Sequence, residues 1–209
     1  MSAENLSVRK RRKEARPAEL VAAALELFVD RGFAATRLED VAALAGVSKG
    51  TLYLYFANKE ALFQAVVRAG MLPVMDEAEA MLARHAGGDF ELLACLLLQW
   101  WEKVGATRLS GISKLIVAEA GNFPELARFY HENVIRRGRA MLAGVLRRGM
   151  ESGEFRRLDI DHCIDLIFAP LFALAVWQHS IHRHQDGLSD PRAVLDTHLE
   201  LLRGGLLAG

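Results

Sequence analysis

A short polar segment at residues 48–59 carries the residue types whose chemistry is clearest in this chain. It begins Ser48-Lys49-Gly50-Thr51, four small or polar residues at the predicted start of a helix. A helix that enters the major groove of DNA needs such residues at its exposed N-terminal end, because its backbone must approach the base edges. Gly50 costs roughly 1 kcal/mol relative to Ala in a helix, and close approach to another surface would account for it. The segment therefore predicts contact with nucleic acid.

The preceding residues supply a helix that would hold this segment in place. Thr36 is a predicted N-cap, with Glu39 three residues later in the pattern of a capping box. Gly46 ends this helix, and Ser48 caps the next one, which runs to about Phe56. A glycine-containing turn sets two short helices near a right angle and projects the second. Such a pair is also common as plain scaffolding, so the exposed polar residues carry the functional prediction.

Charge is distributed unevenly along a chain whose formal net charge is zero. Residues 1–59 hold ten Lys or Arg against seven Asp or Glu (10 − 7 = +3), and the remainder holds 16 against 19 (16 − 19 = −3). This asymmetry predicts a polyanion partner for the N-terminal end. We expect residues 1–16 to be a flexible basic arm that is disordered without DNA. A solvated tail and a minor-groove arm both fit it, and either would add salt-dependent attraction.

The rest of the pattern is helical. Apolar residues recur at intervals of three and four and strand-like alternation is nearly absent, which predicts an all-α fold of about nine helices. Pro17 suits the first turn of the first helix, and Gly32 ends it. A long fourth helix is predicted from its N-cap Asn58 to about Leu82.

Four stretches of the N-terminal quarter resemble the DNA-binding domain of the TetR family of transcriptional regulators. They are residues 32–36 (GFAAT), 40–42 (DVA), 45–56 (AGVSKGTLYLYF) and 58–63 (NKEALF). The resemblance covers residues 17–63 and implies a helix-turn-helix, a fourth helix linked to the core, and a homodimer on palindromic double-stranded DNA. With the motif itself it gives the candidate DNA-binding residues Thr36, Arg37, Ser48, Lys49, Gly50, Thr51, Tyr53, Tyr55 and Lys59. Leu54 departs from the polar or aromatic residue that many members carry there.

The resemblance implies that residues 64–209 form a helical domain for ligand sensing and dimerisation. The candidate lining of an apolar cavity is Trp100, Trp101, Phe129, Met141, Phe168, Phe172 and Trp177, with ordinary core packing as the alternative for each. Glu119 could face a polar ligand, cap the following Asn122 turn or pair with an arginine. Gln99, His131 and Gln178 are weaker candidates of the same kind.

The last two predicted helices, residues 159–180 and 190–204, each have two apolar sides. A single recognition helix reads too few base pairs to specify a site, whereas a two-fold pair about 34–36 Å apart doubles the readout. We expect these helices to form a four-helix bundle with their symmetry mates. The predicted interface residues are Leu171, Leu174, Gln178, Leu195, His198, Leu199 and Leu202.

Other functional classes lack their motifs in this sequence. It has no glycine-rich phosphate loop, no G-x-S-x-G elbow and no H-E-x-x-H pair, so we predict a protein that is not an enzyme and carries no cofactor. His179, His182 and His184, close to Asp186, could share a metal. A helix end facing solvent explains them equally well, and we predict no metal site.

The cysteines and apolar runs indicate the compartment. Cys95 and Cys163 lie in apolar stretches without metal-like spacing, which favours reduced core thiols in the cytoplasm. The longest apolar run, residues 166–177, contains Pro170 and is shorter than the ~20 residues of a membrane span. No signal peptide is evident. We predict a cytoplasmic protein without a membrane partner.

Taken together, the residues and the resemblance predict a sequence-specific regulator. Repression is the default by resemblance, with release from the operator by a small hydrophobic or aromatic ligand that moves the fourth helix. The alternative is an architectural DNA-binding protein that senses nothing. An architectural protein would bind random DNA nearly as well as any specific site.

Overall fold

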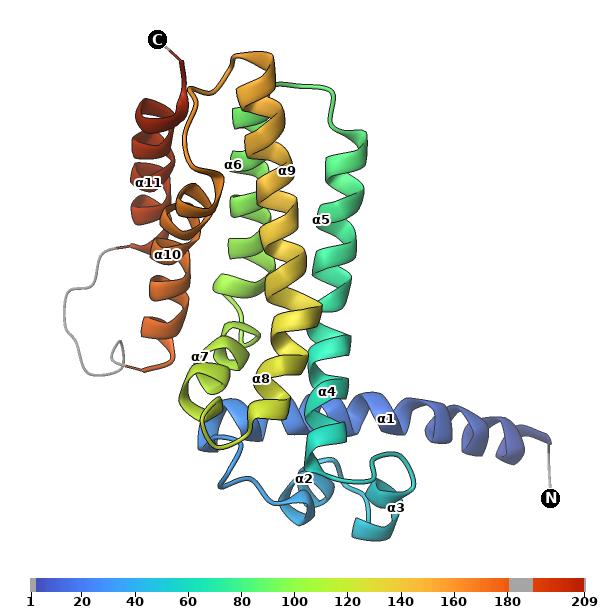
Figure 1. Cartoon of the computed structure of the whole chain (residues 1–209). Helices are drawn as coiled ribbons and strands as arrows, with labels where there is room; N and C mark the ends of the chain where they lie inside the picture. Colours follow the sequence, from blue (N-terminus) through green and yellow to red (C-terminus); the bar gives the residue numbers. More distant parts are fainter. Residues whose placement is uncertain (1–2, 181–189, 209) are drawn as a thin grey trace.

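The computed structural model describes residues 3–180 and 190–208, with side chains from Arg16 onward. Over these residues it contains eleven α-helices, two short π-helical segments and one isolated bridge, Phe155 to Leu207, but no β-strand. The predicted all-α fold is confirmed. Figure 1 shows α1 lying across one end of a bundle of long helices, with the short helices α2 and α3 beyond it.

The N-terminal part consists of α1 (Ala3–Arg31), α2 (Leu38–Leu44) and α3 (Lys49–Tyr53). Helix α1 begins at Ala3 and so includes most of the residues predicted as a flexible arm, 1–16. Residues 3–16 are mostly strong helix formers. Pro17, which was predicted in the first turn of this helix, lies inside it, where it removes one backbone hydrogen bond. Gly32, at a φ of 87°, ends α1 as predicted.

The larger part of the chain is built from long helical rods. In chain order they are α4 (Lys59–Gly70) with α5 (Leu72–Arg84), α6 (Asp89–Trp100) with η1 (Trp101–Gly105), α7 (Ser110–Glu119), α8 (Pro124–Tyr130) with η2 (His131–Ile135) and α9 (Arg136–Ser152), α10 (Ile160–Gln178) and α11 (Pro191–Leu206). The predicted long fourth helix is divided at Met71, because Pro73 in the first turn of α5 cannot donate a hydrogen bond.

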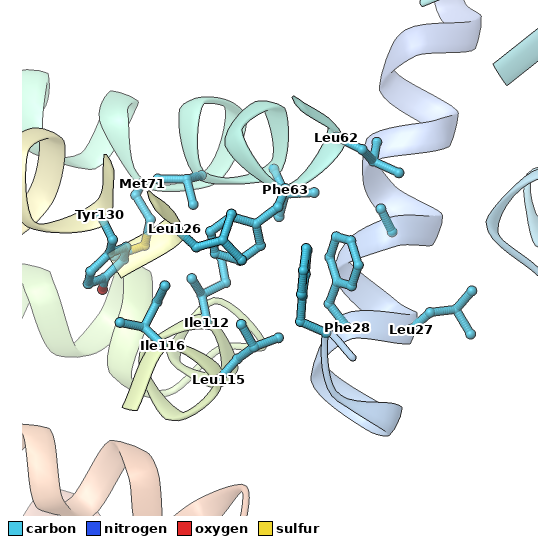
Figure 2. Close-up of a cluster of buried hydrophobic side chains, with 14 of the residues drawn as sticks. Leu27, Phe28, Leu62, Phe63, Met71, Ile112, Leu115, Ile116, Leu126 and Tyr130 are labelled. Carbon is cyan, nitrogen blue, oxygen red and sulfur yellow. The ribbon is translucent and has the colours of Figure 1, made fainter. Parts of the chain in front are cut away.

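Two buried apolar clusters hold the helices together. The first contains residues of α1, α2, α3 and α4 together with α7 and α8. Figure 2 shows part of it, with Phe28 of α1 and Phe63 of α4 close to Ile112 of α7 and Leu126 of α8. The second joins α6, α9, α10 and α11. The helix-turn-helix therefore shares its core with α7 and α8.

Candidate DNA-binding surface and ligand cavity

The start of α3 is fixed by a local cap. Ser48 is the N-cap, as predicted, and its Oγ accepts a hydrogen bond from the Thr51 amide at 3.1 Å. Leu52, one helical turn further on, is completely buried and anchors the inner face. Gly46 adopts a φ of 66°, the left-handed conformation that the turn before α3 requires. The helix is thus held at its start and on its inner face, and its outer face does not pack against the rest of the protomer.

That outer face carries the exposed side chains of the motif. Lys49 and Gly50 are exposed, Tyr53 is 45% exposed and Leu54 is 80% exposed. A Cβ atom added at Gly50 would come no closer than 3.9 Å to its nearest neighbour, the Ser48 Oγ. Nothing within the protomer requires glycine at this position. The absence of a side chain matters only to a surface that approaches α3 from outside, which is what a DNA groove would do.

Lys49 is paired within the protomer. Its ammonium forms an ion pair with Glu39 of α2 and lies 5.9 Å from the centre of the Tyr53 ring. The hydrogen bond from Lys49 lowers the pKa of the Glu39 carboxyl, so this carboxylate stays ionised at neutral pH. Both side chains are about half exposed. The lysine must therefore leave Glu39, or share it, before it can contact a phosphate.

Thr36 has a different place from the one predicted. Its side chain is 1% exposed, and its hydroxyl donates toward the carbonyls of Gly32 at 2.7 Å and Leu27 at 3.2 Å. The prediction that it caps α2 is wrong, because the N-cap is Arg37 and no side chain bonds there. Thr36 instead donates to the carbonyl of Gly32, which directly follows α1 and has no helical amide to pair with. A DNA contact through this hydroxyl would require it to leave the core.

Lys59 also turns inward. Its ammonium donates to the carbonyls of Phe33 at 2.7 Å, Ala34 at 3.1 Å and Thr36 at 3.1 Å. It also lies 4.5 Å from the centre of the Phe33 ring, and burial lowers its pKa. An ammonium has three protons, so this geometry leaves none for the predicted phosphate contact. Lys59 therefore holds the loop between α1 and α2 in place. Neither its residue type nor its spacing in the sequence indicated this role.

The remaining candidates divide between the surface and the core. Arg37 is exposed at the start of α2, and Thr51 is half-buried. Tyr55 is half-buried and packs against the first apolar cluster, whereas Tyr53 lies outward. The structure gives the outer position to Tyr53, because α3 ends there and the chain turns back toward α4.

A cavity of about 380 Å³ lies among α5, α6, α8, η2, α9 and α10, with Ser113 contributed by α7. This volume is within the usual range for small-molecule sites. Four of the predicted residues line it: Trp100, Met141, Phe168 and Phe172. The Trp100 and Phe168 rings pack edge to face, with their centres 4.8 Å apart. The cavity is therefore apolar and partly aromatic, as expected.

The other predicted ligand residues lie elsewhere. Trp101 packs in the second apolar cluster, because it follows Trp100 by one residue and so points about 100° away around the helix. Phe129 packs against the first cluster and contacts Arg68. Trp177 is 40% exposed on α10. None of these three lines the cavity.

The cavity also has polar members, of which Gln99 was a predicted candidate and Ser113 and Tyr130 were not. The Ser113 hydroxyl lies 3.0 Å from the Tyr130 hydroxyl, and burial raises the pKa of that phenol. Gln99 also lines the wall, and Arg139 pairs with Asp165 at its edge. A polar residue on the buried face of an apolar helix was the available signal for Ser113. This signal could not be used from the sequence, because the sequence did not show which face of α7 is buried.

Comparison with known proteins identifies the arrangement. Residues 20–66 match the family described as bacterial regulatory proteins of the tetR family, and residues 87–186 match the tetracyclin repressor-like C-terminal domain. The HTH-type transcriptional regulator TtgR of Pseudomonas putida is 30% identical, over 94% of this chain and 96% of its own length. The chain belongs to the TetR family. It is a DNA-binding transcriptional regulator, and the relatives it matches are regulators and not enzymes.

Solved structures share the whole fold of this TetR-family protein. FadR from Bacillus subtilis, crystallised with stearoyl-CoA, has a TM-score of 0.76 at 24% identity, over 90% of this chain and 98% of its own. A regulator from Saccharomonospora viridis, crystallised with choline, has a TM-score of 0.77 at 21% identity, over 94% and 99%. These two ligands differ greatly in chemistry. The fold alone therefore does not specify what the TetR-family cavity holds.

Helix α7 connects the cavity of this TetR-family protein with its DNA-binding part. At its C-terminal end, the Glu119 carboxylate accepts the Ala34 amide at 3.1 Å and the Asn122 side-chain amide at 3.4 Å. Of the alternatives predicted for Glu119, this geometry favours a role at the Asn122 turn, and Glu119 is not among the residues that line the cavity. Before α7, Arg108 forms an ion pair with Asp30 of α1 at 2.7 Å.

The predicted dimer residues mostly face the protomer's own core. Leu171 and Leu195 are completely buried, and Leu174, Leu199 and Leu202 pack against the second apolar cluster. Gln178 is half-buried, and a ring nitrogen of His198 lies 2.8 Å from the Ile167 carbonyl. These residues therefore lie on the face that joins α11 to α10 within the protomer, whereas the prediction placed them between two protomers. Both faces are apolar, so periodicity does not distinguish them.

The outer face of α10 and α11 is exposed and apolar. Leu166 is 72% exposed and Leu201 is 70% exposed. Ala169 and Ala173 lie at helical spacing between Leu166 and Trp177 and are also exposed. Only five of the nineteen residues of α10 are buried, although the helix is long and apolar enough, by length and composition alone, to cross a membrane. This stripe is what the protomer leaves uncovered.

The histidine cluster is only partly described. A ring nitrogen of His179 lies 2.7 Å from the Ser110 hydroxyl. His182, His184 and Asp186 lie outside the described residues. Within residues 3–180 and 190–208, no three His, Cys, Asp or Glu side chains gather as metal ligands would.

Proposed function

We propose that this TetR-family regulator is a cytoplasmic, homodimeric repressor that leaves a palindromic operator when a small, largely apolar molecule fills its cavity. The observation that carries the proposal is the position of α7. Ser113 of α7 lines the cavity, and Glu119, six residues later, holds the backbone of the loop that leads into α2. One rigid helix therefore touches both the ligand site and the base of the helix-turn-helix.

The loop at residues 33–36 receives contacts from two sides. The Lys59 ammonium of α4 donates hydrogen bonds to three of its carbonyls, and the Glu119 carboxylate of α7 accepts one from the Ala34 amide. This loop leads directly into α2, which packs on α3. A ligand that displaces α7 relative to α4 would therefore change the position of α3. The proposal keeps the expected movement of α4 and adds α7 as the element that the ligand touches.

The energies involved are small enough for a few contacts to carry. A 100-fold loss of operator binding needs roughly 2.7 kcal/mol of coupling. One hydrogen bond contributes about 1 kcal/mol, and an exposed ion pair about 0–1 kcal/mol. The Glu119 hydrogen bond and the Arg108–Asp30 ion pair do not reach that total alone. The packing of Val29 against Gly111, where an added Cβ would meet the valine at 2.6 Å, must change with them.

For the DNA contacts we propose the exposed part of the motif. Arg37, Lys49 and Tyr53 would reach phosphates and base edges, and Gly50 would let the backbone approach. Ser48 and Thr51 would contribute at the start of α3, with Tyr55 at its edge. Thr36 and Lys59 would support the surface from behind.

For the dimer we propose the stripe of Leu166, Ala169, Ala173 and Trp177 on α10, together with Leu201 on α11. A two-fold axis would bring these four helices into one bundle and cover the same patch on both protomers. The exposure of Leu166 and Trp177 on α10 and of Leu201 on α11 supports this face.

The test is a selection of DNA from random duplexes by the purified protein at moderate salt. Enrichment of a palindrome is the expected result, and it provides the probe for operator release by candidate ligands. Binding without enrichment that disappears as salt rises would contradict the proposal and favour the architectural alternative.

A further inference from the structure

Gln99 has an amide oxygen that nothing in the described protein satisfies. It lies on α6 and lines the cavity beside Trp100. Its Oε1 and the Nε2 of Gln178 are the buried side-chain polar atoms without a hydrogen-bond partner among residues 16–180 and 190–208. A buried acceptor left unpaired is costly enough to be rare in native proteins. An atom of this kind in the wall of a ligand site requires a donor from elsewhere.

The orientation of the Gln99 amide is set by a neighbouring acid. Its Nε2 donates to the Glu77 carboxylate on α5 at 3.4 Å. Lys103 pairs with the same carboxylate at 2.9 Å, and its hydrogen bond lowers the pKa of Glu77. An ionised carboxylate can only accept, so the amide nitrogen must face it. The amide oxygen is thereby directed away from Glu77, and it cannot exchange places with the nitrogen.

The charged groups of the cavity lie only at its edge. Arg139 pairs there with Asp161 and Asp165, and both carboxylates are largely exposed to solvent, which screens their charge from the buried wall. Ser113 and Tyr130 share one hydrogen bond at 3.0 Å, so one of their two hydroxyl protons remains available to a ligand acceptor. A charged ligand would lose its hydration in this cavity without gaining a counterion. The wall therefore favours a neutral molecule.

We infer that the cavity binds an uncharged, largely apolar molecule whose N–H or O–H group donates a hydrogen bond to the Gln99 amide oxygen. This inference rests on the proposed function, in which the cavity is the effector site. It assigns Gln99 as the residue that selects for a donor and Glu77 as the residue that positions it. The aromatic wall of Trp100 and Phe168 would hold the apolar body of the molecule.

The test compares two probes that differ in one proton, with the full-length protein in isothermal titration calorimetry. The probes are para-pentylphenol, which has an O–H donor, and para-pentylanisole, in which a methyl group replaces that proton. The wild type should bind the phenol at least about tenfold more tightly, which is the effect of one hydrogen bond to a buried acceptor. Gln99→Met should remove this preference and leave the affinity for the anisole unchanged.

Two further variants separate the inference from a general effect on packing. Gln178→Met removes the other buried unpaired amide, which does not line the cavity, and should keep the preference of the wild type. Glu77→Gln leaves a neutral neighbour that can donate as well as accept, so the Gln99 amide can turn over. It should reduce the preference for the phenol without abolishing binding of the anisole.

Several results would overturn the inference. They are equal affinities of the wild type for the two probes, a preference that survives Gln99→Met, and tighter binding of para-pentylbenzoate or para-pentylbenzylammonium. Absence of binding by all four probes would also overturn it, because the cavity would then not accept a neutral apolar molecule. Failure of the proposed function has a different signature. The phenol would bind with the Gln99-dependent preference and leave the selected operator fully bound.

Discussion

Replacement of Lys59 distinguishes a role in holding the loop at residues 33–36 from a role in contacting a DNA phosphate. In Lys59→Met the side chain keeps its length and its contact with the Phe33 ring but loses all three donors to the loop carbonyls. A hydrogen bond from a charged group contributes about 1.5–3 kcal/mol. The bond to Ala34 lies at the surface, where water can replace the ammonium. We therefore count the other two bonds at the low end of that range and expect a loss of about 2–3 kcal/mol.

This loss is measurable in thermal unfolding followed by circular dichroism. A domain of this size loses about 2–4 °C in Tm per kcal/mol, so the variant should unfold about 4–12 °C below the wild type. Arg37→Met is the matched control, because Arg37 is exposed at the start of α2. Its Tm should stay within about 1 °C of the wild type, as expected for most surface substitutions.

The salt dependence of operator binding gives the second readout. Each phosphate contact contributes about −0.9 to the slope of log K against log salt. The proposed dimer carries two copies of Arg37, so Arg37→Met should reduce the magnitude of that slope by about 1.8 between about 50 mM and about 200 mM salt. Lys59→Met should leave it unchanged at temperatures where the variant is folded. A Lys59→Met protein with the Tm of the wild type and a smaller slope would refute the role in holding the loop and restore the phosphate contact.

Four other substitutions test the Lys49 ion pair, the proposed dimer face and the role of α7. Glu39→Gln frees Lys49 for DNA and should raise operator affinity up to about fivefold in low salt, with a gain that fades as salt rises; an unchanged affinity in anisotropy titrations would contradict it. Leu166→Asp should give a folded monomer in sedimentation. Leu171→Asp buries an unpaired charge and should not fold. A Leu166→Asp protein that remains a dimer would exclude the proposed face. Glu119→Ala should keep operator binding within about threefold but weaken ligand-induced release by about five- to tenfold, and release equal to that of the wild type would exclude α7 as the link.

Local rules predicted the features that depend on neighbours in the sequence. The Ser48 cap involves a residue only three positions away, and the buried stripe of α1 follows the period of a single helix. Both were predicted correctly because nothing distant is needed to form them. The same holds for Asn58, whose side chain accepts the Ala61 amide at 2.7 Å.

Distant partners decide the contacts that the sequence pattern did not predict. Lys59 bonds to carbonyls 23 to 26 residues earlier, and Glu119 bonds to an amide 85 residues away. A charged residue in a sequence is usually assigned to the solvent or to a ligand. The loop whose backbone bonds these two side chains has no sequence motif that would predict the contact. The same reason separates Trp100 from Trp101, since only the assembled bundle determines which of two adjacent rings meets the cavity.

The polar atoms gathered around residues 33–36 have a common physical origin. A helix that ends in a buried region leaves carbonyls and amides that must be satisfied by something other than the helix. At the end of α1 the partners come from the hydroxyl of Thr36, the ammonium of Lys59 and the carboxylate of Glu119, so the loop is held by α4 and α7 together with its own side chain. The need to satisfy this backbone thus ties the helix-turn-helix to two helices of the larger domain. A regulator built on this fold obtains its mechanical connection from the ordinary requirement that buried polar groups be paired.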